Sequence, residues 1–99
     1  MANKIKMSPD ICAYSDENDG KLNIEIELPG VKKKDITFQL REDSFYVSAP
    51  KHDVEYIGSY AICYPVMPNK AHAKYTDGLL TVTVPYREPL GKAFNVQIK

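Results

Sequence analysis

Apolar and polar residues alternate with a period of two along much of this chain. The clearest case is residues 22–28, where four apolar residues are separated by polar ones: Leu22, Ile24, Ile26 and Leu28. Successive side chains of a β-strand point to opposite faces, so this pattern is typical of a strand with one face on a core and the other in water. Similar alternation predicts further strands at residues 36–40, 45–49, 59–64, 71–75 and 80–84.

Turn signals separate these segments. They are Asp19-Gly20, Pro29-Gly30, Glu42-Asp43 and Asp77-Gly78. No window of eleven or more residues has the i, i+3, i+4, i+7 spacing of an amphipathic helix. Short strands with turns at close intervals therefore predict an all-β fold, an antiparallel sandwich of seven or eight strands.

Length and charge narrow the class of protein. A chain of 99 residues is long enough for one domain and too short for two. Thirteen basic residues balance thirteen acidic ones, which disfavours nucleic acid and anionic membranes as partners. The apolar runs are too short to span a bilayer, and residues 1–9 lack the apolar stretch of a signal peptide. These features favour a cytoplasmic protein.

Some side chains are expected at the edge of the core. Cys12 and Cys63 lie far apart with no CxxC motif, which favours free, partly buried thiols in a reducing compartment. Tyr60, Tyr64 and Tyr75 share the apolar parity of their segments, so we expect them to pack on the core.

Residues able to carry chemistry are sparse. The cysteines, together with His52 and His72, have no metal-ligand spacing, and no residue lies in a recognisable nucleophile context. The three lysines at 32–34 have acidic neighbours, which is typical of a solvated turn. We therefore expect no metal, no cofactor and no enzymatic activity.

Several local patterns occur in the order found in one family. They are Leu28-Pro29-Gly30-Val31, Asp35-Ile36, Tyr64-Pro65, Ala73 with Asp77-Gly78-Leu79-Leu80, and Val82 to Pro85. In these patterns the chain resembles the α-crystallin domain of small heat-shock proteins. The resemblance implies an immunoglobulin-like sandwich at residues 10–85, a short N-terminal segment at 1–9 and a C-terminal extension at 86–99. It also implies an ATP-independent holdase that binds partly unfolded client proteins and self-associates as a dimer or weak oligomer.

In that family an apolar groove between two edge strands receives an I-x-I motif from a neighbouring chain. The matching groove residues here are Ile36, Phe38 and Leu40 on one strand and Ala71, Ala73 and Tyr75 on the other. The small alanines would leave room for a docked side chain.

The chain's tail carries a V-x-I version of the docking motif. Val96 and Ile98 are one residue apart, so in an extended segment both point to one face. Pro89 and Gly91 would let this tail leave the domain. The alternative is that Phe94, Val96 and Ile98 form a last strand of the chain's own sheet.

Two features depart from the family pattern. Only about nine residues precede the first predicted strand, which predicts weak holdase activity unless the chain is a trimmed form of a longer protein. The eight residues of Pro50 to Ile57 span at most about 26 Å, too little to deliver a swapped strand onto a partner. The chain then either stays monomeric or pairs along the edge of the Glu55–Tyr64 strand.

Edge pairing is the favoured of these two interpretations. That strand carries Tyr56, Ile57 and Tyr60 and contains no Lys or Pro, the usual protection of an edge against association. A second class of protein stays open: a CS-domain-like co-chaperone, or interaction module, shares the sandwich but lacks holdase activity. The V-x-I tail favours the small heat-shock protein, because a monomeric module has no use for a docking tail.

Overall fold

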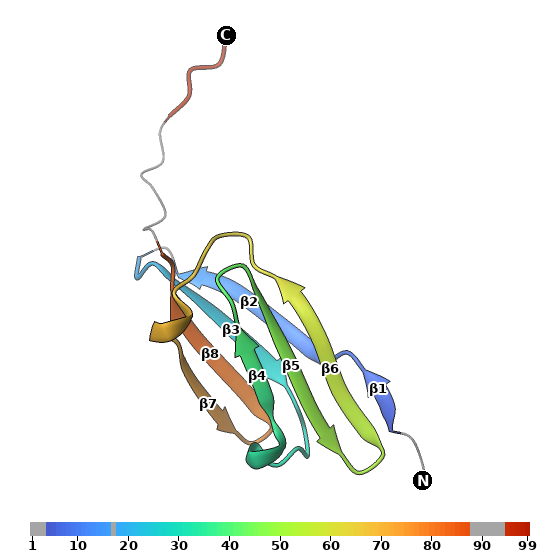
Figure 1. The fold of residues 1–99 in the computed structure, drawn as a ribbon. Coiled ribbons are helices and arrows are strands. Elements are labelled where there is room, and N and C mark those ends of the chain that lie inside the picture. The colour runs from blue at the N-terminus through green and yellow to red at the C-terminus, as the bar shows by residue number, and fades with distance from the viewer. Residues whose placement is uncertain (1–3, 17, 88–94) are drawn as a thin grey trace.

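The computed structural model describes residues 4–16, 18–87 and 95–99, and its described part is built from β-strands (Figure 1). Two short 3₁₀ turns, Lys33–Asp35 and Pro68–Lys70, are the helical elements in this part of the chain. The strands are β1 (Ile5–Met7), β2 (Asp10–Asp16), β3 (Lys21–Glu27), β4 (Thr37–Leu40), β5 (Ser44–Lys51), β6 (Val54–Ala61), β7 (His72–Thr76) and β8 (Leu79–Pro85).

The strands form two four-stranded sheets. One sheet has the order β1-β6-β5-β4 and the other the order β2-β3-β8-β7. All pairs are antiparallel except β1 with β6, which run parallel. The predicted all-β sandwich is therefore confirmed.

β1 was not expected. It lies inside the segment 1–9 that the sequence assigned to an N-terminal extension, and it pairs Ile5 with Val54 and Met7 with Tyr56. The first strand of the described chain thus begins at Ile5 rather than at Asp10.

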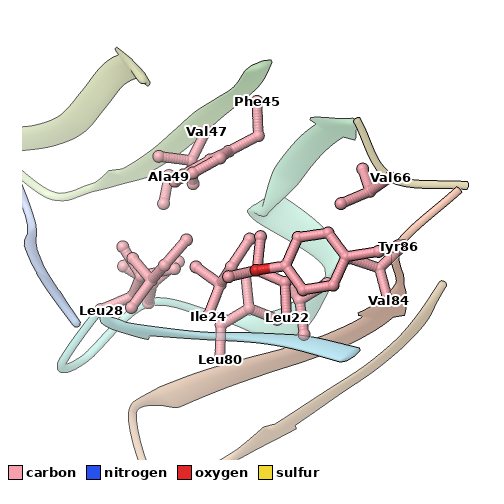
Figure 2. Packing of buried hydrophobic residues seen from close by; sticks show 13 residues of the cluster. Leu22, Ile24, Leu28, Phe45, Val47, Ala49, Val66, Leu80, Val84 and Tyr86 are labelled. Carbon is pink, nitrogen blue, oxygen red and sulfur yellow. The ribbon is translucent and has the colours of Figure 1, made fainter. Parts of the chain in front are cut away.

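The core lies between the sheets and consists mostly of residues that the alternation placed inward, together with Val31, Val66 and Tyr86 from outside those segments. Ile24, Ile26, Leu28, Val47, Ala49, Val66 and Val84 have no exposed surface. Phe45, Leu80 and Tyr86 are also buried in this cluster, as Figure 2 shows. The opposite faces of β3 and β8 carry Asn23, Glu25, Thr81 and Thr83.

Two tight turns fix the registers of the hairpins. Asp77 and Gly78 join β7 to β8 with positive φ values of 51° and 84°, as a two-residue hairpin turn requires. His52 and Asp53 join β5 to β6, and Lys51 pairs directly with Val54. Pro50 to Ile57 is therefore a hairpin within one sheet, as the loop length predicted.

The strand predicted to run to Tyr64 ends earlier, at Ala61. The Ile62 amide then donates to the Asp43 carbonyl and the Val66 amide to the Glu42 carbonyl. Tyr64 is 57% exposed, so the expectation that it packs in the core was wrong. The expectation of partly buried thiols was also wrong, because Cys12 and Cys63 are both exposed, although both are free.

Candidate functional site

The two strands expected to form the groove both lie at edges. β4 ends one sheet and β7 ends the other, and both edges are on the same side of the sandwich (Figure 1). We call this region the β4/β7 edge pair. An edge strand has backbone N–H and C=O groups without a partner on its outer side, so it can accept a further extended segment.

The predicted residues of β4 face the interior. Phe38 pairs with Val47 and Leu40 with Phe45, both buried in the core. Ile36, which precedes the strand, has the same parity. All three side chains are half-buried and pack against the core cluster. They therefore form an apolar row along the inner side of this edge.

The predicted residues of β7 also face the interior. Ala73 pairs with Val82 and Tyr75 with Leu80, which are both buried. Ala71 and Tyr75 are half-buried against the core. Ala73 is exposed although it lies on the inward side of this edge strand, opposite Val82. Apolar surface at this position is thus left open.

Tyr75 has a second role that its apolar parity did not reveal. Its hydroxyl lies 2.8 Å from the Leu28 carbonyl oxygen and 2.7 Å from that of Val31, and donates to both. The Leu28 amide in turn donates to the Gly78 carbonyl at 2.7 Å. Two of the motifs that carry the family resemblance, one at Leu28–Val31 and the other around Gly78, are thus joined to each other.

Backbone geometry explains why two positions in these motifs are glycine. Gly30 and Gly78 have φ values of 79° and 84°, which side-chain-bearing residues rarely adopt. A Cβ at Gly78 would lie 3.2 Å from the Cα of Pro29, so the close approach of the two turns also favours glycine there. These motif residues build the frame beside the β4/β7 edge pair.

The tail motif is exposed. Val96 is 81% exposed and Ile98 93% exposed, and residues 95–99 belong to no strand. Phe94, which the alternative interpretation placed in a last strand with them, lies outside the described residues. Two large apolar side chains in water are thus available for contact with another surface.

The predicted dimer edge differs from expectation in two ways. Tyr56 and Tyr60 pair with Ala49 and Phe45 and so face the core, while Ile57 lies on the opposite face. The edge is also partly covered, because β1 pairs with Val54 to Tyr56. The prediction of an uncovered strand was therefore wrong for Glu55 and Tyr56.

The inward face of β6 continues an aromatic row across its sheet. The ring of Tyr60 stacks on that of Phe45 with 5.2 Å between centroids, and Phe45 lies 5.6 Å from Phe38. Lys51 places its Nζ 5.3 Å from the ring centre of Tyr56. The rings of Tyr56 and Tyr60 thus pack on the inward face of β6. At its outer edge this strand presents backbone groups and not these rings.

Other polar residues lie apart from the β4/β7 edge pair. His52 is in the β5–β6 turn, and His72 is exposed on β7. No group of three potential ligands that could hold a metal ion occurs in the described part of the chain. The Glu25 carboxylate raises the pKa of the exposed Tyr14 hydroxyl, which donates to it at 3.4 Å. No helix in the described ranges is long and apolar enough to cross a membrane.

A family model and the sequence of a related protein both match this chain. The model of the Hsp20/alpha crystallin family matches residues 14–99. A probable 15 kDa heat shock protein of Leptospira interrogans is 29% identical in an alignment of 105 positions, gaps included, that covers 92% of this chain and 79% of that protein.

Solved structures share the fold at lower sequence identity. Heat shock protein 16.0 from Schizosaccharomyces pombe has a TM-score of 0.75 at 22% identity, covering 94% of this chain and 99% of that one. HSP18.5 from E. histolytica has a TM-score of 0.74 at 17% identity, covering 93% and 99%.

The sandwich, its two joined motifs and the family match define a small heat-shock protein domain. The chain belongs to the Hsp20/alpha crystallin family. Members of this family are ATP-independent chaperones and not enzymes, and they generally form oligomers and bind unfolded clients. The expectations of a chaperone class and of no enzymatic activity are thereby confirmed.

Proposed function

We propose that this protein is a holdase that binds apolar, extended segments of partly unfolded proteins along the β4/β7 edge pair. The observation that carries the proposal is Ala73, which faces inward beside Val82 and is nevertheless exposed. An extended client segment could add to a strand edge through its backbone and place an apolar side chain over Ala73. Phe38 and Leu40 would form the facing wall.

Aggregating intermediates expose the two features that such a site covers, namely apolar side chains and unpaired strand edges. Binding of this kind needs neither a cofactor nor ATP. The same site would accept Val96 and Ile98 from a second copy of the chain. Burial of two such side chains contributes about 3 to 5 kcal/mol before the cost of ordering the tail, so this self-contact should be reversible.

The alternative, a CS-domain-like interaction module without holdase activity, is less well supported. The family match favours a small heat-shock protein, and the exposed V-x-I tail offers a means of self-association. We also propose that the free part of the β6 edge pairs with a second copy about a two-fold axis.

The proposed client site is tested by placing a charge in it. Ala73→Glu puts a carboxylate on the inward side of β7, where an apolar client side chain would have to displace its water. His72→Glu is the matched control, because it puts the same group on the neighbouring, exposed residue of the same strand.

Aggregation of a heated client protein is followed by light scattering without ATP. Wild type and His72→Glu should suppress scattering at a several-fold molar excess, and Ala73→Glu should require several-fold more protein for the same effect. Equal suppression by all three proteins would place client binding elsewhere. No suppression by wild type would favour the interaction module.

A further inference from the structure

The short strand β1 lies along the β6 edge, which is the edge proposed above for self-association. All three residues of β1 are exposed, and Ile5 and Met7 are among the large apolar side chains most open to water, at 63% and 47%. None of them belongs to the core cluster or to the partly buried hydrophobic residues packed against it. The strand is thus attached to the sandwich mainly through its backbone.

The pairing of β1 is short. It joins three residues to Val54, Glu55 and Tyr56 in parallel, and parallel pairing is slightly weaker per residue than antiparallel pairing. Within the residues that the structure describes, no strand pairs with the outer edge of β6 at residues 57–61. β1 therefore covers the first part of this edge and leaves the second part open.

The direction of the backbone groups shows what the edge can accept. The Ile5 amide donates to the Asp53 carbonyl at 2.7 Å, so Asp53 directs its carbonyl to the outer side of β6. Because backbone groups alternate along a strand, Glu55, Ile57 and Ser59 direct theirs to the same side. On β5, Pro50 lies opposite Glu55. Pro50 has no N–H to donate, and this position does not need one, because the backbone groups of Glu55 point to the outer side of β6.

This edge is complementary to a second copy of itself. In an antiparallel pair centred on Gly58, Ile57 would face the partner's Ser59 and Glu55 the partner's Ala61, so no like charges would meet. The free edge offers only Ile57 to Ala61 while β1 is bound. Release of β1 would extend it to the seven residues from Glu55 to Ala61, with correspondingly more backbone hydrogen bonds.

We propose that β1 is a displaceable cover that competes with a second copy of the chain for the β6 edge. β1 bound in its own sheet favours the monomeric or weakly paired form. Its release favours a β6-to-β6 dimer. This inference rests on the proposed edge pairing and adds to it a control by the chain's own N-terminal residues.

Proline substitutions in β1 can remove either the amides that face β6 or the amide that faces away from it. Ile5→Pro combined with Met7→Pro removes the donors that face β6, because Ile5 donates to Asp53 and Met7 has the same parity. Lys6→Pro is the matched control, since the Lys6 amide points away from β6. Deletion of residues 1–7 is a second variant that releases the edge without introducing proline.

The dissociation constant is measured by sedimentation equilibrium in chains that also carry Val96→Ser and Ile98→Ser. That background removes association through the tail, so a failure of tail docking does not affect the result. We expect the double proline and the deletion to tighten self-association by about tenfold or more, and Lys6→Pro to leave it unchanged. Adding Ser59→Pro should abolish the gain.

Two results would overturn the proposal. One is self-association of the double-proline and deletion variants that is no tighter than that of the parent. In that case β1 does not compete for the edge, and weaker association would mean that it contributes to the dimer. The other is a gain that persists with Ser59→Pro, which would place the new contact away from β6.

Discussion

At the scale of single residues, Tyr75 connects the groove wall to the family motifs. Its ring lies on the inward side of β7, as the alternation predicted, and its hydroxyl donates to the carbonyls of Leu28 and Val31. The residue thus fixes the end of β7 to the turn that leads toward β4. Loss of the hydroxyl should loosen this end of the β4/β7 edge pair.

Tyr75→Phe should lower the free energy of unfolding by about 1 to 2 kcal/mol, because two carbonyls lose a shared donor. Urea unfolding measures this change. Tyr14→Phe is the control, since the exposed Tyr14 hydroxyl donates only to the Glu25 carboxylate and its loss should cost less than about 0.5 kcal/mol. Equal stability of the two variants would show that the Tyr75 hydrogen bonds do not contribute.

The alternating pattern predicts whether a side chain faces the core or the solvent only for residues that lie within a strand. Tyr60 and Tyr75 lie in β6 and β7 and face inward as predicted. Tyr64 has the same parity as Tyr60, but the chain leaves the sheet after Ala61 and the ring is exposed. Cys12 faces outward on β2, opposite Glu25, and is exposed for that reason.

At the scale of elements, strands with an alternating apolar face were predictable and the three-residue edge strand β1 was not. β3 and β8 alternate over seven residues each, which identifies a buried face. β1 has only three residues, all exposed, so no hydrophobic period marks it. Its parallel partner is distant in the sequence, and such pairing depends on the tertiary structure rather than on local pattern.

The β6 edge provides the test at this scale. Ser59→Pro removes an amide that points to the outer edge and leaves the ladder with β5 in place, so it should weaken pairing between two copies by about tenfold or more. The dissociation constant from sedimentation equilibrium, in the Val96→Ser and Ile98→Ser background, measures this.

Ser59→Ala is the control for that variant, because it removes the hydroxyl and keeps the amide. It should associate like the parent chain. Unchanged association of Ser59→Pro, with the same thermal unfolding as Ser59→Ala, would show that the β6 edge takes no part in pairing.

At the scale of the whole molecule, the sequence was sufficient for the fold and the family. Alternation identified the sandwich, and the order of motifs far apart in the chain indicated the family. Two of these motifs meet in space at Leu28 and Gly78. Four of the six candidate groove residues lie on β4 and β7 and face inward, and Ile36 and Ala71 directly precede these strands. What occupies the edge pair depends on a second molecule, so no pattern within one chain determines it.

The most direct test is the mass of the protein in solution, measured by light scattering at matched concentrations. The tail and the edge pair are two halves of one proposed contact between copies. Val96→Ser with Ile98→Ser alters one half and Ala73→Glu the other. Each should therefore lower the apparent mass to the same value, and the three changes together should lower it no further.

Gln97→Ser is the control in the tail and should keep the wild-type mass. All of these variants should unfold at nearly the wild-type temperature, because the altered residues are exposed. Equal masses for wild type and both variants would contradict docking of the tail at the β4/β7 edge pair. Unfolding of the domain by the tail substitutions would show instead that Val96 and Ile98 pack within their own chain.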